Sequence, residues 1–166
     1  VEVDKEKKNP YDFALWIKAP ENHLMKWDSP WGPSYPGWHI ECSAMGQKYL
    51  GEQFDIHTGG IDLIPTHHEN EIAQSKGACG KIPARYWMHG EYLLINGGKM
   101  SKSLGNVYLL DDIVNRGYDP LVYRLFSYSC HYRNKLNFTW EGMDASAKSY
   151  ERLKDGYQKH LVGEDE

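Results

Sequence analysis

The sequence predicts an α/β protein built around a parallel sheet. Short apolar runs that suit buried strands alternate along the chain with segments whose apolar residues recur every three to four positions, as in helices. Such alternation is typical of parallel sheets, because a helix forms the crossover between one parallel strand and the next. With 166 residues, of which 40% are hydrophobic, the chain is long enough to bury one core.

The expected elements follow one another in a simple order. The segment from Glu21 to Tyr35 is rich in proline, tryptophan and polar residues, which is typical of a loop. Beyond it we expect, in chain order, a helix from about His39 to Leu50 that Gly51 ends, a strand near Ile56, a helix from His67, a strand near Tyr92, and short helices around Asp111 and from Pro120.

A long amphipathic helix is predicted from about Trp140 to Leu161. Its apolar and aromatic residues keep a spacing of three to four: Met143, Ala147, Tyr150, Leu153, Tyr157 and Leu161. The chain has no internal repeat and no low-complexity stretch.

Composition limits the classes of function. The formal net charge of -4 argues against a general nucleic-acid binder, whose affinity comes mainly from neutralising phosphates, although local basic patches can still contact RNA. No apolar run is long enough to cross a bilayer or to act as a secretory signal. Three cysteines, Cys42, Cys79 and Cys130, form an odd set without disulfide spacing, which favours a reducing compartment. We therefore expect a cytoplasmic protein without a membrane partner.

Three residues supply ligand types that suit one tetrahedral zinc ion: Cys42, His67 and Glu71. His67 and Glu71 are four residues apart, so on a helix their side chains lie on the same face. A site with three protein ligands keeps a position for water or substrate, whereas structural zinc usually has four Cys or His ligands. A plainer interpretation stays open, in which Cys42 is a small buried hydrophobic residue and the helix carries solvated polar side chains.

The helix that carries His67 and Glu71 has start and stop signals in the sequence. Thr66 and Glu69 have the spacing of a capping box, and Gly77 stands where a helix end is expected. His67 is therefore expected in the first turn of this helix. Since Cys42 is expected on the preceding helix, packing of the two helices would bring the three ligands together.

The segment 87–106 predicts a strand, a tight turn and then a basic loop. Asn96-Gly97 is a strong turn signal between apolar runs. Lys99 and Lys102, with serines interleaved, suit a phosphate chain, because ammonium groups neutralise its charge while hydroxyl and backbone N–H groups donate hydrogen bonds. An ordinary exposed loop of lysine and serine is the alternative interpretation.

A glycine-rich turn follows the strand near Ile56. Gly59 and Gly60 would let the backbone approach a nucleotide beyond the carboxyl end of that strand, and Asp62 would accept hydrogen bonds from ribose hydroxyls. The competing interpretation is a plain turn in which Asp62 caps the next helix.

Taken together, these segments resemble one family. The sequence KMSKS at 99–103 resembles the second signature of class I aminoacyl-tRNA synthetases. The sequences GWHIECSAM at 37–45 and PTHHENE at 65–71 resemble cysteinyl-tRNA synthetases in particular. The resemblance runs over nearly the whole chain, and the occurrence of these segments in this order is far more specific than any one of them.

The resemblance implies roles for individual residues. Zinc would bind the thiolate of substrate cysteine and be held by Cys42, His67 and Glu71, while Trp38 and His57 would line the cysteine pocket. ATP, used with Mg2+, would contact His57, Gly59, Gly60, Asp62 and Lys102. Lys99 and Lys102 would be the catalytic residues, because they would stabilise charge on the phosphates.

The resemblance also implies an architecture. Residues 1–106 would belong to the second half of a Rossmann-like catalytic domain that carries the zinc site and the lysine loop, and residues 107–166 would form a flanking helical subdomain. The chain has no match to the first class I signature, a His-x-Gly-His type loop, nor to the N-terminal motif that supplies a further Cys ligand. We therefore expect the missing N-terminal half as a partner and no activity from this chain alone.

The implied function is the activation of cysteine with ATP and its transfer to tRNA(Cys). Coordination explains how serine is rejected, because zinc prefers thiolate to an alcohol, whereas size alone separates such near-isosteres by only about 1–3 kcal/mol. One departure from the family is Ser34-Tyr35, where an arginine commonly stands, which puts that charged contact in doubt. Two alternatives stay open: a related ligase that joins cysteine to an amino sugar, and a non-catalytic zinc-binding module.

Overall fold

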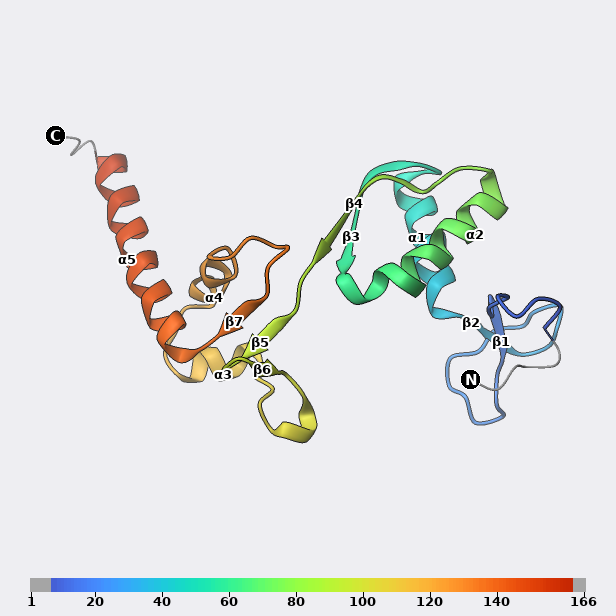
Figure 1. The fold of residues 1–166 in the computed structure, drawn as a ribbon, viewed down its shortest axis with the longest axis horizontal. Coiled ribbons are helices and arrows are strands. Elements are labelled where there is room, and N and C mark those ends of the chain that lie inside the picture. Colours follow the sequence, from blue (N-terminus) through green and yellow to red (C-terminus); the bar gives the residue numbers. More distant parts are fainter. Residues whose placement is uncertain (1–6, 163–166) are drawn as a thin grey trace. The chain divides into compact units, whose positions relative to one another are not determined.

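The computed structural model describes residues 7–162, with side chains to residue 161. This part of the chain folds into two compact units. The first holds the described residues up to Thr58 together with Asp62–Met88, and the second holds Gly59–Ile61 together with the described residues from His89 onward. Figure 1 shows the helices and strands of both units.

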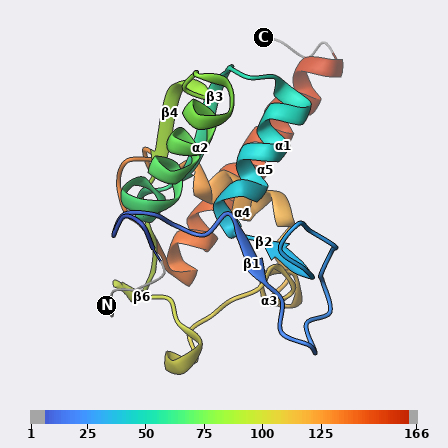
Figure 2. The ribbon, with the colours of Figure 1, turned by 90° about the vertical axis from the view of Figure 1, so that its right-hand side faces the viewer.

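The first unit holds two helices, the greater part of two longer strands and two short strands. β3 (Phe54–Gly60) pairs with β4 (Ala84–Gly90). The N–H of Phe54 donates to the carbonyl of Pro83 at 2.8 Å, so the two strands begin side by side and run in the same direction. α1 (Trp38–Leu50) and α2 (Glu69–Cys79) lie beside each other in Figures 1 and 2. The order β3, α2, β4 is therefore a β-α-β crossover, as the alternation of strand and helix predicted.

The first helix agrees closely with its prediction. α1 ends at Gly51, whose φ of 92° is accessible mainly to glycine. At the other end, the N–H of Gly37 donates to the carbonyl of Leu15 at 2.8 Å. A Cβ on Gly37 would lie 2.5 Å from the carbonyl oxygen of Ala14, so the start of α1 can approach this segment only through a glycine.

The predicted capping of the second helix is wrong at both ends. Residues Ile64–His68 form a π-helical turn that leads directly into α2, so Thr66 does not cap the helix and His67 lies in the turn before it. Gly77 does not end α2, which continues to Cys79 and stops at Gly80 with a φ of 73°. Glycine inside a helix costs only about 1 kcal/mol, which tertiary packing readily offsets.

Two short strands of the first unit were not predicted. β1 (Trp16–Lys18) pairs antiparallel with β2 (Ser34–Pro36), and β2 overlaps the end of the segment predicted as a loop. Neither strand has more than three residues, too few to show an alternation of apolar and polar positions.

The second unit is built on a three-stranded sheet in the order β6-β5-β7. β5 (Leu93–Ile95) pairs antiparallel with β6 (Gly98–Lys99) and parallel with β7 (Leu136–Phe138). Asn96 and Gly97 join β5 to β6 with φ angles of 49° and 78°, both positive as a type I′ turn requires. The turn predicted at this dipeptide is therefore confirmed.

The sheet differs from the prediction in its continuity. The strand expected around Tyr92 is divided, because β4 ends at Gly90 and β5 begins at Leu93. The described residues form three small sheets rather than one. The fold is nevertheless mixed α/β with parallel sheet elements, namely β5 with β7 and β3 with β4.

Three helices complete the second unit, and all three were predicted. They are α3 (Leu110–Asn115), α4 (Pro120–Ser127) and α5 (Trp140–Val162). The buried core beneath them consists of Ile95, Ile113, Val122, Phe126, Phe138 and Met143. Met143 is fully buried, so the first turns of α5 fix this helix to the core.

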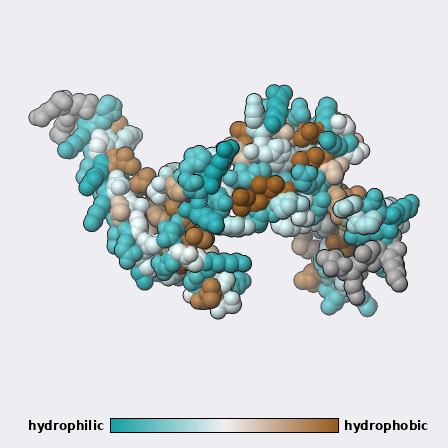
Figure 3. All heavy atoms as spheres, viewed as in Figure 1, coloured by the Kyte–Doolittle hydropathy of each residue, from teal (hydrophilic) through white to brown (hydrophobic). Residues whose placement is uncertain are grey.

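Several large apolar side chains remain exposed in each unit. Figure 3 shows hydrophobic residues at the surface of α5 and over the unit that contains α1 and α2. On α5, Leu153, Tyr157 and Leu161 are 60–66% exposed and follow one another at intervals of four residues. Within residues 7–162, no helix has the length and apolar content needed to span a bilayer.

Candidate metal centre and lysine loop

The structure brings Cys42, His67 and Glu71 together in the first unit. Cys42 lies on α1, His67 on the π-helical turn and Glu71 in the first turn of α2. One ligand atom from each residue lies within 4.8 Å of the ligand atoms of the other two. His67 and Glu71 are only 4% and 2% exposed, whereas Cys42 is half-buried.

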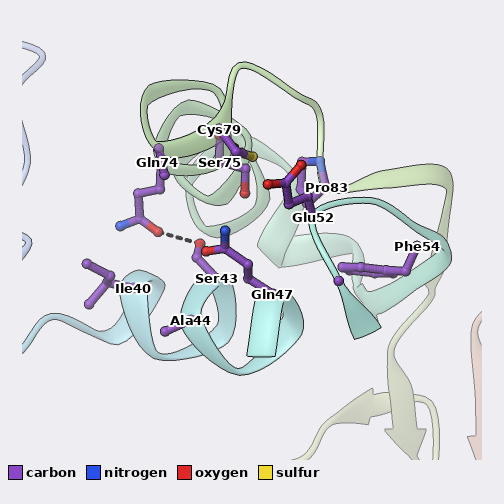
Figure 4. A pocket seen from close by; sticks show the side chains of 12 residues that line it. Ile40, Ser43, Ala44, Gln47, Glu52, Phe54, Gln74, Ser75, Cys79 and Pro83 are labelled. Carbon is purple, nitrogen blue, oxygen red and sulfur yellow. Dashed lines mark hydrogen bonds between the residues drawn. The ribbon is translucent and has the colours of Figure 1, made fainter. Parts of the chain in front are cut away.

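A hydrogen bond between the helices supports this convergence. Ser43 Oγ donates to Gln74 Oε1 at 2.6 Å, as Figure 4 shows. Ser43 follows Cys42 on α1, and Gln74 lies one turn beyond Glu71 on α2. The cavity drawn in Figure 4 is lined by both helices, but none of the predicted site residues contributes to its wall.

The carboxylate of Glu71 is held by two imidazoles. His67 Nε2 lies 3.1 Å from one carboxylate oxygen, and His57 Nε2 lies 3.2 Å from each of the two. The ring of His57, which stands on β3, packs against the rings of His68 and Trp87. A buried carboxylate needs such partners, because an unpaired one is strongly destabilising. His57, His68 and Glu71 also form a second set of ligand atoms within 4.8 Å of one another.

The other nitrogen of His67 faces a further histidine. His39 Nδ1 lies 2.8 Å from His67 Nδ1, and between two neutral rings one nitrogen must donate and the other accept. If His39 donates, His67 carries its proton on Nε2 and donates to Glu71, which satisfies both residues without a metal. If His67 donates, its Nε2 presents a lone pair toward the carboxylate of Glu71. A cation bound by both Nε2 and the carboxylate would stabilise that second arrangement.

The electrostatic surroundings agree with these two arrangements. Burial, and then the neighbouring His67, lower the pKa of His39, so this ring is neutral at neutral pH and can accept a hydrogen bond. Burial, followed by the carboxylates of Glu71 and Glu41, raises the pKa of Cys42. Cys42 is therefore a thiol when no cation is present, and a bound divalent cation would favour the thiolate.

The donor set fits zinc. Zinc binds thiolate, imidazole and carboxylate at about 2.0–2.3 Å, so the donors of one tetrahedral site lie roughly 3.3–3.8 Å apart. The 3.1 Å between His67 Nε2 and the Glu71 carboxylate is close to that separation. Three protein donors leave a fourth position for another ligand.

Trp38 lies directly beside this cluster. It is the first residue of α1, and its ring centroid is 4.4 Å from that of His67. The side chain is 62% exposed, so one part contacts a candidate ligand while the rest faces solvent. Its role in a cysteine pocket stays a prediction.

The glycine-rich turn lies at the end of β3. Gly59 and Gly60 are the last two residues of that strand and are half-buried. Asp62 is exposed within the 3₁₀ turn Ile61–Leu63 that follows. The predicted contacts of these residues and of His57 with a nucleotide stay predictions, and the bond from His57 to Glu71 is an interaction that the sequence did not indicate.

The lysine loop belongs entirely to the second unit. Lys99 ends β6 and Lys102 begins a 3₁₀ turn, and both side chains are exposed. Ser101 caps that turn, because its Oγ accepts from the N–H of Leu104 at 3.3 Å. Met100 is half-buried and packs against the core. The two exposed lysines therefore flank a short backbone segment that the Ser101 cap and the packing of Met100 hold in place.

Sequence reasoning missed His39 as a neighbour of the cluster. A signal was present, since His39 precedes Cys42 by three residues on a predicted helix, and such residues share a face. No comparable signal linked Ser43 to Gln74, which lie 31 residues apart.

Comparison with known proteins gives a consistent result. The family described as tRNA synthetases class I (C) catalytic domain matches residues 1–148. A cysteine–tRNA ligase of Treponema denticola is 53% identical over 165 residues, which cover 98% of this chain and 34% of the relative. A cysteine–tRNA ligase of Thermus thermophilus is 50% identical over 159 residues, covering 96% of this chain and 33% of the relative. That of Bacillus thuringiensis Al Hakam is 54% identical over 157 residues, with coverage of 95% and 33%.

These matches confirm the resemblance that the motifs predicted. The chain spans about one third of the length of the curated relatives it matches. Because the family match extends over 148 of the 166 residues and includes every candidate site residue, the chain belongs to the class I tRNA synthetase (C) catalytic domain family.

Proposed function

We propose that this chain is part of a ligase that activates cysteine with ATP and transfers it to tRNA(Cys). The observation that carries the proposal is the convergence of a half-buried Cys42 with the buried His67 and Glu71 in a member of this family. The three relatives described above are cysteine–tRNA ligases, and about half of the residues are identical over nearly the whole chain.

The three converging residues would hold a zinc ion together with the further Cys ligand of the N-terminal half, and the ion would take the substrate thiolate as an additional ligand. Bound there, zinc supplies a soft Lewis acid that favours a thiolate over the hydroxyl of serine. His67 would bind through Nε2 while its Nδ1–H donates to His39, and His57 would hold the Glu71 carboxylate from its other side. Trp38 would cover the bound cysteine side chain, because it lies against His67 with most of its surface exposed.

The reaction follows in two steps. The carboxylate of cysteine attacks the α-phosphate of ATP and pyrophosphate leaves, after which a hydroxyl of the terminal ribose of tRNA(Cys) attacks the acyl carbon of the cysteinyl adenylate and AMP leaves. The attacking carboxylate is already ionised, so no strong general base is required. Lys99 and Lys102 would stabilise the charge on the phosphates, with Mg2+ bound to ATP. Gly59, Gly60 and Asp62 would contact the adenosine, together with His57.

The architecture of the longer protein is part of this proposal. Residues 1–106 would complete a Rossmann-like domain with an N-terminal half, and residues 107–166 would form a flanking helical subdomain. The exposed apolar residues of each unit support further packing partners, because surfaces of this kind usually form contacts.

We expect the 166 residues alone to give no cysteine-dependent pyrophosphate exchange, since the relatives are about three times as long. The ligase would act in the cytoplasm, where its tRNA is charged.

A chimera tests the function directly. This chain would replace the matching segment of the Treponema denticola ligase, and cysteine-dependent pyrophosphate exchange and tRNA charging would be measured. We expect both activities, together with one zinc per molecule. Exchange without tRNA charging but with amide formation on an amino sugar would support the related ligase instead. Tight zinc binding by a folded chimera without exchange would support a non-catalytic zinc-binding module.

A further inference from the structure

The lysine loop is closed at its base by one side chain that has no assigned role. Asn106 Oδ1 accepts a hydrogen bond from the N–H of Ser101 at 2.9 Å. Asn106 Nδ2 donates to the carbonyl of Lys99, also at 2.9 Å. The carboxamide thus bridges the two backbone groups that flank Met100, and it converts residues 99–106 into a closed ring.

We propose that Asn106 is the positioning residue that sets Lys99 and Lys102 for a nucleotide polyphosphate. This inference rests on the proposed function and adds a residue to the same site. Asn106 holds Lys99 directly, through a hydrogen bond to its backbone carbonyl. Lys102 is reached through Ser101, whose N–H is held by Asn106 while its hydroxyl caps the 3₁₀ turn that begins at Lys102.

The chemistry of the carboxamide explains why asparagine suits this position. It offers one acceptor and one donor on a short arm, and the two bonds here need one of each. Aspartate would keep the acceptor for Ser101 but place an oxygen against the carbonyl of Lys99. Alanine would release both backbone groups.

A fixed backbone beneath exposed lysine side chains has a functional consequence. Ammonium groups act as point charges, and their effect on a polyphosphate depends on where they stand when charge develops. Asn106, the Ser101 cap and the packed Met100 hold the loop backbone through contacts made within the chain itself. A loop backbone that its own contacts hold in place loses less conformational entropy when a polyphosphate binds.

Limited proteolysis of this chain tests the positioning without relying on catalysis. Trypsin cleaves after Lys99 and Lys102, and cleavage after Lys18 in the other unit serves as the internal standard. For Asn106→Ala we expect cleavage in the loop to rise about tenfold, because two hydrogen bonds that oppose local opening are lost. Asn106→Asp should lie between Asn106→Ala and the parent. Asn115→Ala, at an exposed asparagine at the end of α3, is the matched control and should not change the rate.

Kinetics in the Treponema denticola chimera test the functional part. Asn106→Ala should lower kcat for pyrophosphate exchange about tenfold while the KM for cysteine and the zinc content stay unchanged, and Asn106→Asp should recover part of the loss. Parent-like loop cleavage, or parent-like kcat, in Asn106→Ala would overturn the inference. An inactive parent chimera would overturn the proposed function instead, and the cleavage experiment on this chain would still decide whether Asn106 orders the loop.

Discussion

The metal cluster and the lysine loop achieve their geometry by opposite means. In the cluster, buried side chains hold one another: His67 is bonded to His39, and Glu71 to His57. In the loop, exposed side chains stand on a backbone that neighbouring residues hold, above all Asn106. The cluster therefore depends on contacts between distant segments, whereas the loop backbone depends on hydrogen bonds within eight residues and on the packing of Met100 against the core. Substitutions should separate these two kinds of dependence.

The largest effect is expected for Cys42→Ser in the isolated chain. Structural zinc sites with four ligands bind with about 10–16 kcal/mol, so one ligand is worth roughly two to three orders of magnitude in affinity. Competition with a chromophoric chelator would measure the change, and Cys79→Ser is the matched control, because Cys79 lies on α2 outside the cluster. Tryptic cleavage of the lysine loop should not change. Equal zinc affinity for both serine variants would remove Cys42 from the ligand set.

Lys102→Ala should give the next largest effect, and in a different assay. Removing a charge that stabilises a developing oxyanion typically costs about a hundredfold in kcat, so pyrophosphate exchange by the chimera should fall by that factor. Zinc affinity should stay at the parent value, because Lys102 belongs to the loop. Lys148→Ala, at an exposed lysine of α5, provides the control. Exchange at the parent rate in Lys102→Ala would leave the loop as an ordinary exposed segment.

The two regions also differ in how far the sequence predicted them. The tight turn at Asn96-Gly97 was predicted, because the dipeptide itself determines the backbone. Residue types and an i,i+4 spacing predicted the ligand triad. The π-helical turn that presents His67, and the bonds from His39 and His57, depend on segments up to 28 residues apart. Gly77 shows a different limit, because α2 runs through this glycine to Cys79 and ends at a second one, Gly80, whose φ is 73°.

His39→Ala should weaken zinc binding about tenfold to a hundredfold, the usual effect of removing the group that orients a ligand histidine. The variant removes the acceptor for His67 Nδ1–H, so the arrangement of His67 that leaves Nε2 free for a metal loses its partner. Calorimetric titration with a competing chelator would measure the affinity. His23→Ala is the control, since His23 stacks on Tyr35, outside the cluster. If both alanine variants bind zinc equally well, His67 does not need His39 to bind the metal.

Asn137→Ala should have the smallest effect, and it tests whether the loop is held by local bonds. Asn137 Oδ1 accepts from the N–H of Gly97 at 2.6 Å, and this exposed bond fixes the turn at the start of the loop to β7. Its loss should reduce the free energy of unfolding by about 0.5–1.5 kcal/mol, and amide exchange at Gly97 should speed up accordingly. Asn137→Asp keeps the acceptor and should restore the slow exchange. Asn137 belongs to the second unit and the cluster to the first, so zinc affinity should not change in Asn137→Ala. A changed affinity would show that the two regions are coupled through the chain and do not hold their geometry independently.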